Sequence, residues 1–253
     1  WTLGEPMPGG LERIALSPDG ALLALSGDQG PVELWDVADR RRVASISTDL
    51  GEFPTALSWN PEGDLLAVAV ARGGGGGLVV VDREGVEQGA VPFDDDLFPS
   101  WLAFGAGGSW VAVNLDTPRD DASRRGVRVI NWRTGEVRRT IDEGTGAVAA
   151  DPVGDRVAVV ADVSGSAGVW PAGDEPVVAR LSRNEQFLGL AWSADGRRLA
   201  TGGASGTVRV WDPDTGVPVA ALRGHDAAVL SVAFSQDGRR LASLDVDGVV
   251  RVW

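Results

Sequence analysis

A turn-like quartet of residues recurs six times along this chain at nearly constant spacing. The copies are SPDG at 17–20, NPEG at 60–63, GAGG at 105–108, DPVG at 151–154, SADG at 193–196 and SQDG at 235–238. Successive copies begin 42 to 46 residues apart. Because proline presets φ, aspartate bonds to the nearby backbone and glycine adopts positive φ, these quartets predict tight turns. A repeat of this length restricts the chain to architectures built from one recurring unit.

Short apolar runs flank the quartets, and they have the composition of β-strands. In the fifth repeat, LAW precedes the quartet, RRLAT follows it, VRVWD comes third and VPVAAL comes fourth. Valine, isoleucine, phenylalanine and tryptophan dominate such runs along the chain, and they suit the half-buried surface of a sheet. No stretch of the chain shows a persuasive helical period. The sequence therefore predicts an all-β chain of four-stranded antiparallel blades, and the superperiod of about 40–45 residues favours a β-propeller over a sandwich.

The six quartets predict six blades, but only five sets of three strands are followed by a fourth. The first residues, WTLGEPM at 1–7, read as a shortened form of WDPDTGVPV at 211–219. We therefore expect the N-terminal strand, near Glu5–Gly9, to pair beside the strand that ends at Trp253 and to close the ring, which removes exposed sheet edges. The alternative is a longer array with a seventh blade. We assign residues 1–253 to a single propeller domain, either whole or as a segment of a longer chain.

The third runs carry a resemblance to a known family. VELWD at 32–36, VRVWD at 208–212 and VVRVW at 249–253, together with LRGHD at 222–226, resemble WD repeats (WD40). The resemblance is strong in the last two repeats, clear in the first and degraded in the middle three. It implies a β-propeller that presents binding surfaces and usually has no catalysis. Similarity to bacterial WD-repeat chains implies a docking array that can be fused to a kinase or NTPase domain outside these residues.

The resemblance also implies a hydrogen-bonded network within the last repeat. Its four positions are matched by His225, Ser243, Asp247 and Trp253. An alternative interpretation makes Ser243 a nucleophile and His225 its base. A nucleophile needs an exposed oxygen and an oxyanion hole, whereas buried polar groups that satisfy one another need neither. We therefore expect a structural network and no catalytic residue.

Two other repeats keep only part of this network. The fifth has Thr201 and Trp211, with Ser205 where the aspartate is expected. The first has Ser26 and Trp35, with Gln29 at that position. We expect strand packing, more than these networks, to hold the blades together.

Composition limits the possible partners. The net charge is −13, which disfavours nucleic acid, because binding to phosphates depends on lysine and arginine. The same charge favours basic proteins or peptides through electrostatic steering. There are no cysteines, so disulfides and thiolate metal sites are excluded. No apolar run approaches the roughly 20 residues of a membrane helix, and we expect a cytoplasmic protein that binds neither membrane nor cofactor.

The start of each first strand predicts the binding surface. Aligning SWLAF at 100–104 on LSVAF at 230–234 places Trp101 opposite Ser231, where other repeats have Arg13, Ala56, Ala147 and Gly189. Tryptophan and arginine dominate interaction hot spots. We expect a protein or peptide to bind at these predicted binding residues: Glu12, Arg13, Phe98, Trp101, Leu188 and Leu230. The alternative for Trp101 is that it fills the channel.

Three further hypotheses stay open. The first is a lactonase-like or hydrolase-like propeller enzyme with an oxygen-ligated metal in its channel, for which Asp116, Asp162 and Asp245 lie in comparable turns. The second is a contact between copies of the chain. The third concerns RGGGGGL at 72–78, which lacks the Lys-Ser/Thr of a phosphate loop and predicts a flexible hairpin tip.

Overall fold

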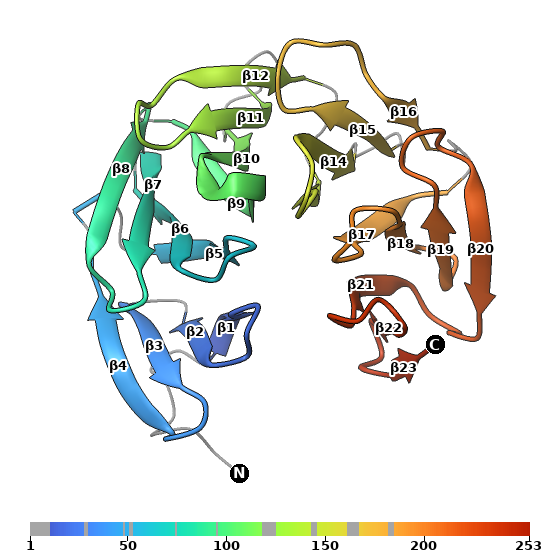
Figure 1. Cartoon of the computed structure of the whole chain (residues 1–253), viewed down its shortest axis with the longest axis horizontal. Helices are drawn as coiled ribbons and strands as arrows, with labels where there is room; N and C mark the ends of the chain where they lie inside the picture. Colours follow the sequence, from blue (N-terminus) through green and yellow to red (C-terminus); the bar gives the residue numbers. More distant parts are fainter. Residues whose placement is uncertain are drawn as a thin grey trace. The chain divides into compact units, whose positions relative to one another are not determined.

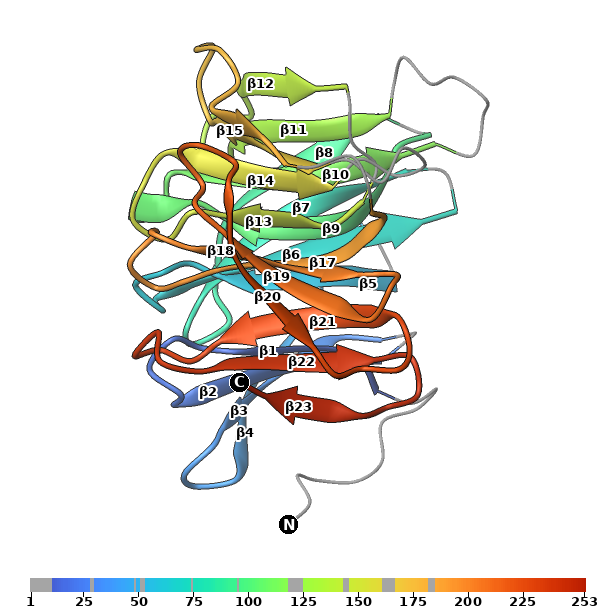
Figure 2. The same cartoon turned by 90° about the vertical axis from the view of Figure 1, so that its right-hand side faces the viewer.

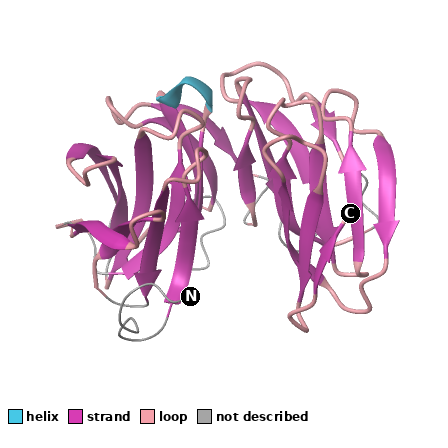
Figure 3. Ribbon diagram, turned by 60° about the horizontal axis from the view of Figure 1, so that its bottom comes forward, coloured by secondary structure: helices cyan, strands magenta, loops and turns pink. Residues whose placement is uncertain are grey.

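The structure is a computed structural model, and strands make up most of it (Figure 3). It describes residues 11–27, 30–47, 49–50, 53–73, 75–94, 96–117, 125–142, 146–160, 167–181 and 185–253. The described residues contain one short 3₁₀ turn, η1 (Ala106–Gly108), and 23 strands. The strands form six sheets, which are the blades of a β-propeller fold (Figure 1). The prediction of an all-β chain with six antiparallel blades is confirmed.

The chain divides into two compact units, Trp1–Arg125 with Ile130–Val137 and Gly126–Val129 with Arg138–Trp253. Blades one and two lie in the first unit. Blade one contains β1 (Leu11–Leu16), β2 (Leu22–Gly27), β3 (Val32–Asp36) and β4 (Arg41–Ile46). Blade two contains β5 (Phe53–Trp59), β6 (Leu65–Arg72), β7 (Gly75–Asp82) and β8 (Glu87–Phe93). In both sheets the spatial order follows the chain.

Blade three contains β9 (Phe98–Phe104), β10 (Trp110–Asp116), β11 (Gly126–Asn131) and β12 (Val137–Ile141). Blades four, five and six lie in the second unit. Blade four contains β13 (Val148–Ala150), β14 (Arg156–Val160), β15 (Ala167–Pro171) and β16 (Ala179–Arg180). Blade five contains β17 (Phe187–Trp192), β18 (Leu199–Gly203), β19 (Thr207–Trp211) and β20 (Pro218–Arg223). Blade six contains β21 (Val229–Phe234), β22 (Leu241–Asp245) and β23 (Val250–Val252).

Five fourth strands are present among the described residues, as the sequence predicts: β4, β8, β12, β16 and β20. Blade six has three strands, and β23 lies at the edge of its sheet (Figure 2). The expected closing strand near 5–9 lies outside the described residues.

The quartets are the turns between first and second strands. In blade one, the N–H of Gly20 donates to the carbonyl of Ser17 at 2.8 Å, and the Ser17 hydroxyl donates to Asp19 Oδ1 at 2.6 Å. The last glycine of five quartets has a φ between 61° and 76°, as expected. Gly154 is the exception; there Arg156 Nε donates to Asp151 Oδ2 at 2.7 Å across the turn.

Apolar side chains between neighbouring blades form the core. Ala24 and Leu34 of blade one pack with Trp59 and Leu66 of blade two. In the second unit, Val208 of blade five packs with Val232 of blade six. Complete burial of one valine or leucine side chain stabilises the fold by about 1.5–3 kcal/mol. Such packing occurs in blades that lack the histidine network as well as in blade six.

The glycine run of blade two is largely a strand rather than a flexible hairpin tip. Gly75, Gly76 and Gly77 are buried in β7, where Gly76 pairs with Ala71 and Phe93. A Cβ added at Gly76 would lie 2.2 Å from the carbonyl oxygen of Val70. The prediction was wrong because the glycines allow the backbones of β6 and β7 to approach closely.

Candidate functional site

The first strand of five blades contains a β-bulge at one common position. In β1, Leu11 pairs with Gly27 and Arg13 with Ser26, which leaves Glu12 without a cross-strand partner. The equivalent bulge residues of β5, β9, β17 and β21 are Thr55, Ser100, Leu188 and Leu230. A bulge bends a strand and re-aims its side chains. Three of the predicted binding residues, Glu12, Leu188 and Leu230, therefore share one structural position.

The residue after each bulge forms a second set of equivalent positions. Trp101 pairs with Asn114 as Ser231 pairs with Leu244 and Gly189 with Gly202. Arg13 and Ala56 have the same place in β1 and β5. In blade four, the N–H of Val160 donates to the carbonyl of Ala147 at 3.0 Å. The alignment predicted from the sequence is thus confirmed by the strand register.

In the first unit, two predicted binding residues are exposed. The side chain of Trp101 is 45% exposed. Arg13 is exposed and its Nε donates to the carbonyl of Thr55 at 2.6 Å, which ties blade one to blade two. Phe98 is half-buried and pairs with Asp116. The side chain of Glu12 lies outside the described part of the structure.

In the second unit, the other two predicted binding residues lie on neighbouring strands. Leu230 is 45% exposed and Leu188 is half-buried. A Cβ added at Gly189 would lie 2.6 Å from the carbonyl oxygen of Leu230, so the backbones of β17 and β21 approach closely. The structure therefore brings Leu188 and Leu230 to adjacent bulges of one unit.

Sequence reasoning missed the polar residues that support Trp101. Asn114, its cross-strand partner, is fully buried, and its Nδ2 donates to the hydroxyl of Ser100 at 3.0 Å. The Oδ1 atom of Asn114 has no hydrogen-bond partner among the described residues. An asparagine inside the apolar run WVAVNLD at 110–116 was the available signal, because a buried amide needs a partner.

His225, Ser243 and Trp253 form the expected network in blade six. His225 Nε2 lies 2.7 Å from Ser243 Oγ, and the Trp253 indole N–H donates to the same oxygen at 2.9 Å. The network is satisfied when Nδ1 carries the histidine proton and Nε2 accepts from the Ser243 hydroxyl. His225 and Ser243 are 7% and 2% exposed, so both are buried.

The carboxylate of this network is Asp245, and the prediction of Asp247 was wrong. Asp245 Oδ2 lies 2.6 Å from His225 Nδ1. Ser243 and Asp245 are two residues apart on β22 and therefore face the same side of the strand. Asp247 lies in the following turn, is exposed, and donates its backbone N–H to Asp245 Oδ1 at 3.1 Å.

The environment of Asp245 favours its charged form. Desolvation by burial acts to raise its pKa, but this effect is outweighed. Hydrogen bonds from the Val249 N–H at 2.9 Å, from His225 and from the Asp247 N–H together hold the pKa of Asp245 below its ordinary value. The Asp245 carboxylate thus fixes the turn as well as the imidazole.

Blade five keeps a shorter form of the network. The Trp211 indole N–H donates to Thr201 Oγ1 at 2.9 Å, as the resemblance implies. The register puts Gly203 at the position of Asp245, and the Glu185 carboxylate occupies the space beside it. Glu185 forms an ion pair with Arg209 and accepts a hydrogen bond from Ser205. A carboxylate from a different position therefore takes the place of the aspartate.

Blade one does not form the network. The register places Leu25, not Ser26, at the position of Ser243, so the assignment of Ser26 was wrong by one residue. The Trp35 indole N–H donates instead to Glu33 Oε2 at 2.9 Å. Ser26 is buried, and its hydroxyl has no hydrogen-bond partner in the described structure. Gln29 lies outside the described residues.

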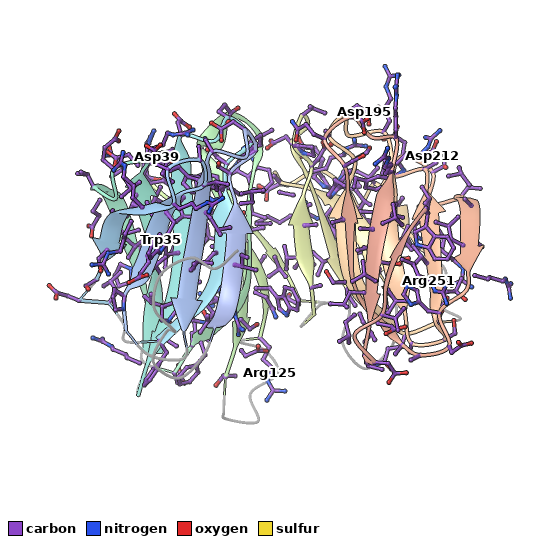
Figure 4. All side chains as sticks on the ribbon, turned by 90° about the horizontal axis from the view of Figure 1, so that it is seen from below. Trp35, Asp39, Arg125, Asp195, Asp212 and Arg251 are labelled. Carbon is purple, nitrogen blue, oxygen red and sulfur yellow. The ribbon has the colours of Figure 1, made fainter. Side chains whose placement is uncertain are left out.

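The charged residues near the quartet turns of the second unit stabilise the fold. Arg156 donates to Asp151 and, at 3.0 Å, to the carbonyl of Gly196, and it pairs with Asp214 of blade five. Asp195 and Asp212, in neighbouring turns, lie on the same side of this unit (Figure 4). Hydrogen bonds from Ser193 and from the Arg197 N–H lower the pKa of Asp195.

The candidate metal ligands do not form a site in the described part of the chain. No group of three or more histidine, cysteine, aspartate or glutamate side chains gathers there in a way that could hold a metal ion. Asp245 is engaged with His225, and Asp162 lies outside the described residues. Ser243, the alternative nucleophile, is buried and accepts the Trp253 indole N–H.

Comparison with known families identifies the repeats. Residues 178–212 and 216–253 match WD40, described as WD domain, G-beta repeat. These segments cover β16 to β19 and β20 to β23, and the order of first, second and third strands is the same in all six sheets of the described residues. The chain therefore carries WD40 repeats in these two segments, as the resemblance implies. The histidine network of blade six lies within the second matched segment.

Two curated relatives are ribosome biogenesis proteins. ERB1 of Chaetomium globosum is 25% identical over an alignment of 142 residues that covers 49% of this chain and 18% of that protein. The BOP1 homolog of Drosophila melanogaster is 27% identical over 139 residues, which are 54% of this chain and 17% of that protein. The matched region thus spans less than a fifth of the length of these relatives.

Solved structures share the β-propeller fold of this chain. The C-terminal WD40 domain of Sif2 superposes with a TM-score of 0.75 at 17% identity, covering 96% of this chain and 69% of that one. Kuenenia stuttgartiensis hydrazine synthase gives a TM-score of 0.75 at 20% identity, covering 96% and 83%. At these identities the likeness shows the fold alone.

The family and its relatives support a general role as a protein-interaction scaffold. Of the segments that the structure describes, none forms a helix with the length and hydropathy needed to cross a bilayer.

Proposed function

We propose that this WD40 propeller is a non-catalytic scaffold that binds a protein or peptide at its first-strand bulges. The observation that carries the proposal is the exposure of two large apolar side chains, one at the bulge of β21 and one directly after the bulge of β9. Trp101 and Leu230 are each 45% exposed, although both lie on strands that otherwise contribute to the core. Exposed tryptophan and leucine side chains supply much of the apolar contact area of interfaces.

The bulge explains why these positions suit binding. A regular strand would alternate its side chains between two neighbouring blades, which would bury them. At a bulge two residues face one partner residue, so the extra side chain leaves this alternation. In the first unit this bulge presents Thr55 and Ser100, and in the second unit it presents Leu188 and Leu230, so each unit has variable side chains on a constant scaffold.

The charge of the chain supports a basic partner. A net charge of −13 attracts positively charged proteins and raises their association rate more than their affinity. We therefore propose a basic protein or peptide that places an apolar side chain against Trp101.

A scaffold role without catalysis agrees with the structural role of the buried polar residues in blade six. His225, Ser243 and Asp245 bond to one another and to Trp253, and all three are buried. A metal ion bound by Asp245 would have to displace His225. The relatives named as ribosome biogenesis proteins agree with a general scaffold role. We also propose a cytoplasmic location and, on the resemblance alone, attachment to a further domain.

Affinity capture with three forms of the chain tests the proposal. The forms are the natural sequence, Trp101→Ala and Val153→Ala, whose valine is 62% exposed in a quartet turn away from the bulges. We expect at least one protein to be captured by the natural sequence and by Val153→Ala but not by Trp101→Ala, at unchanged melting temperature. Identical sets of captured proteins from all three forms would contradict the proposed site. A collapse of the melting temperature of Trp101→Ala would instead support a core role for Trp101.

A further inference from the structure

Two neighbouring quartet turns of the second unit are each followed by a pair of arginines. The pairs are Arg197–Arg198 in blade five and Arg239–Arg240 in blade six, whose first strands approach closely. None of the other four blades has arginine at both positions. All four arginines are exposed. Positive charge is thus concentrated at two neighbouring turns of a chain whose net charge is −13.

The same hydrogen bonds hold the backbone of both arginine pairs. In blade five, the Arg197 N–H donates to Asp195 Oδ1 at 3.1 Å, and the Arg198 N–H donates to Ser193 Oγ at 2.9 Å. The corresponding bonds in blade six are 3.1 and 3.0 Å long. Each turn therefore presents two guanidinium groups from a fixed backbone, which reduces the entropy lost when a partner binds.

Blade one forms the same turn without arginine. The Ala21 N–H donates to Asp19 Oδ1 at 3.0 Å, and the Leu22 N–H donates to the Ser17 hydroxyl at 2.9 Å. The turn is thus complete with alanine and leucine at these two positions. The arginine side chains of blades five and six are therefore not required by the turn, and they are available for contacts outside it.

The four guanidinium groups form no ion pair with any residue that the structure describes. In blade four, by contrast, Arg156 donates to Asp151 Oδ2 at 2.7 Å. The Arg198 guanidinium donates only to the carbonyl of Arg197, at 2.8 Å. The nearby Asp195 Oδ1 accepts the Ser193 hydroxyl and a backbone N–H instead. Exposed arginines of this kind are enriched at interaction hot spots.

We propose that the quartet turns of blades five and six bind an acidic segment of a partner protein through the two arginine pairs. Planar guanidinium groups match carboxylates through parallel N–H···O bonds. The first strand β17 runs from its bulge at Leu188 to the quartet that begins at Ser193, so this site lies at the opposite end of the strand from the bulge. A short acidic segment needs only local complementarity, whereas a long polyanion such as RNA would meet the net charge of −13.

Fluorescence anisotropy with a labelled tetraglutamate peptide tests the proposal on the full chain. We expect Arg197→Ala with Arg239→Ala to weaken binding by at least about tenfold. The melting temperature should not change, because blade one forms the turn with alanine. The matched control, Arg41→Ala with Arg223→Ala, removes the same charge from two exposed positions outside these turns and should change the affinity by less than about twofold. Equal losses from the two double variants, or no binding of the peptide by the natural sequence, would overturn the proposal.

A labelled uridine oligonucleotide that is long enough to extend beyond the two turns separates an acidic protein segment from RNA. We expect it to bind more weakly than tetraglutamate, because most of its phosphates would face an acidic chain. Tighter binding of the oligonucleotide would overturn the choice of a protein segment. Trp101→Ala should bind tetraglutamate as the natural sequence does, so a failure of the proposed bulge site would leave this test unaffected.

Discussion

Asp245 Oδ2 lies 2.6 Å from His225 Nδ1, and this pair joins a turn to the segment before the first strand of blade six. The same carboxylate accepts the backbone N–H groups of Asp247 and Val249. On the other side of the imidazole, Ser243 links His225 to Trp253. One carboxylate at the end of the second strand thus holds the segment before the first strand and the turn that leads to the third.

Replacing Asp245 should destabilise the fold, whereas replacing Asp247 should not. Asp245→Ala leaves His225 and two backbone N–H groups without their acceptor, which should lower the free energy of unfolding by about 2–3 kcal/mol. Asp247→Ala changes an exposed side chain and should stay within about 0.5 kcal/mol of the natural sequence. Denaturant unfolding measures both. Equal losses from the two variants would contradict the assignment of Asp245.

The hydrogen bonds of the quartet turn in blade one should lower the pKa measured for Asp19 in an acid titration. Hydrogen bonds from Ser17, from the Ala21 N–H and from Arg83 lower the pKa of Asp19 to about 2. Because an unfolded aspartate has a pKa of about 3.9, this group stabilises the fold above that pH. The contribution is lost as the pH falls toward 2.

Nuclear magnetic resonance of the Asp19 carboxyl carbon gives its pKa directly. Ser17→Ala removes the largest of the lowering effects and should move the midpoint toward the ordinary value. Ser235→Ala changes the equivalent turn of blade six and should leave Asp19 unaffected. A midpoint near 3.9 in the natural sequence would show that the turn does not form as described.

The glycine run of blade two should tolerate substitution unevenly. Gly76→Ala would place a methyl group 2.2 Å from the Val70 carbonyl oxygen, so we expect a loss of about 1–3 kcal/mol in the free energy of unfolding. Gly73→Ala is the matched control, because an added Cβ there meets nothing within 4 Å. Thermal and denaturant unfolding compare them. A similar, small effect of both changes would indicate a loose hairpin, as the sequence alone predicts.

The repeat made the fold predictable because each blade contains the same turn in the same place. Gly20 and Gly238 adopt positive φ in turns that the spacing alone identified. Family positions then correctly located Trp253 and Ser243, whose side chains meet at 2.9 Å. These features depend on local conformation and on strand alternation, both of which a sequence shows.

Other features depend on which residues lie opposite one another on neighbouring strands. A single sequence gives little information about that pairing. Asp245 was missed in favour of Asp247, although strand alternation from Ser243 would have selected it. Ser26 was misplaced by one residue, since the register puts Leu25 at that position. The carboxylate of Glu185 enters blade five from outside the motif, so no motif could reveal it. Leu188 and Leu230 lie at β-bulges, where the pairing register shifts by one residue. Such a shift is also a matter of which residues pair.

The central claim is that a partner binds at the first-strand bulges, with Trp101 as an anchor. The most direct measurement is the affinity of a captured partner for the natural sequence, for Trp101→Ala and for Val153→Ala by titration calorimetry. The account predicts that Trp101→Ala weakens binding by at least about tenfold, which is about 1.4 kcal/mol, at unchanged melting temperature, while Val153→Ala binds normally. Equal affinity of all three forms would contradict it.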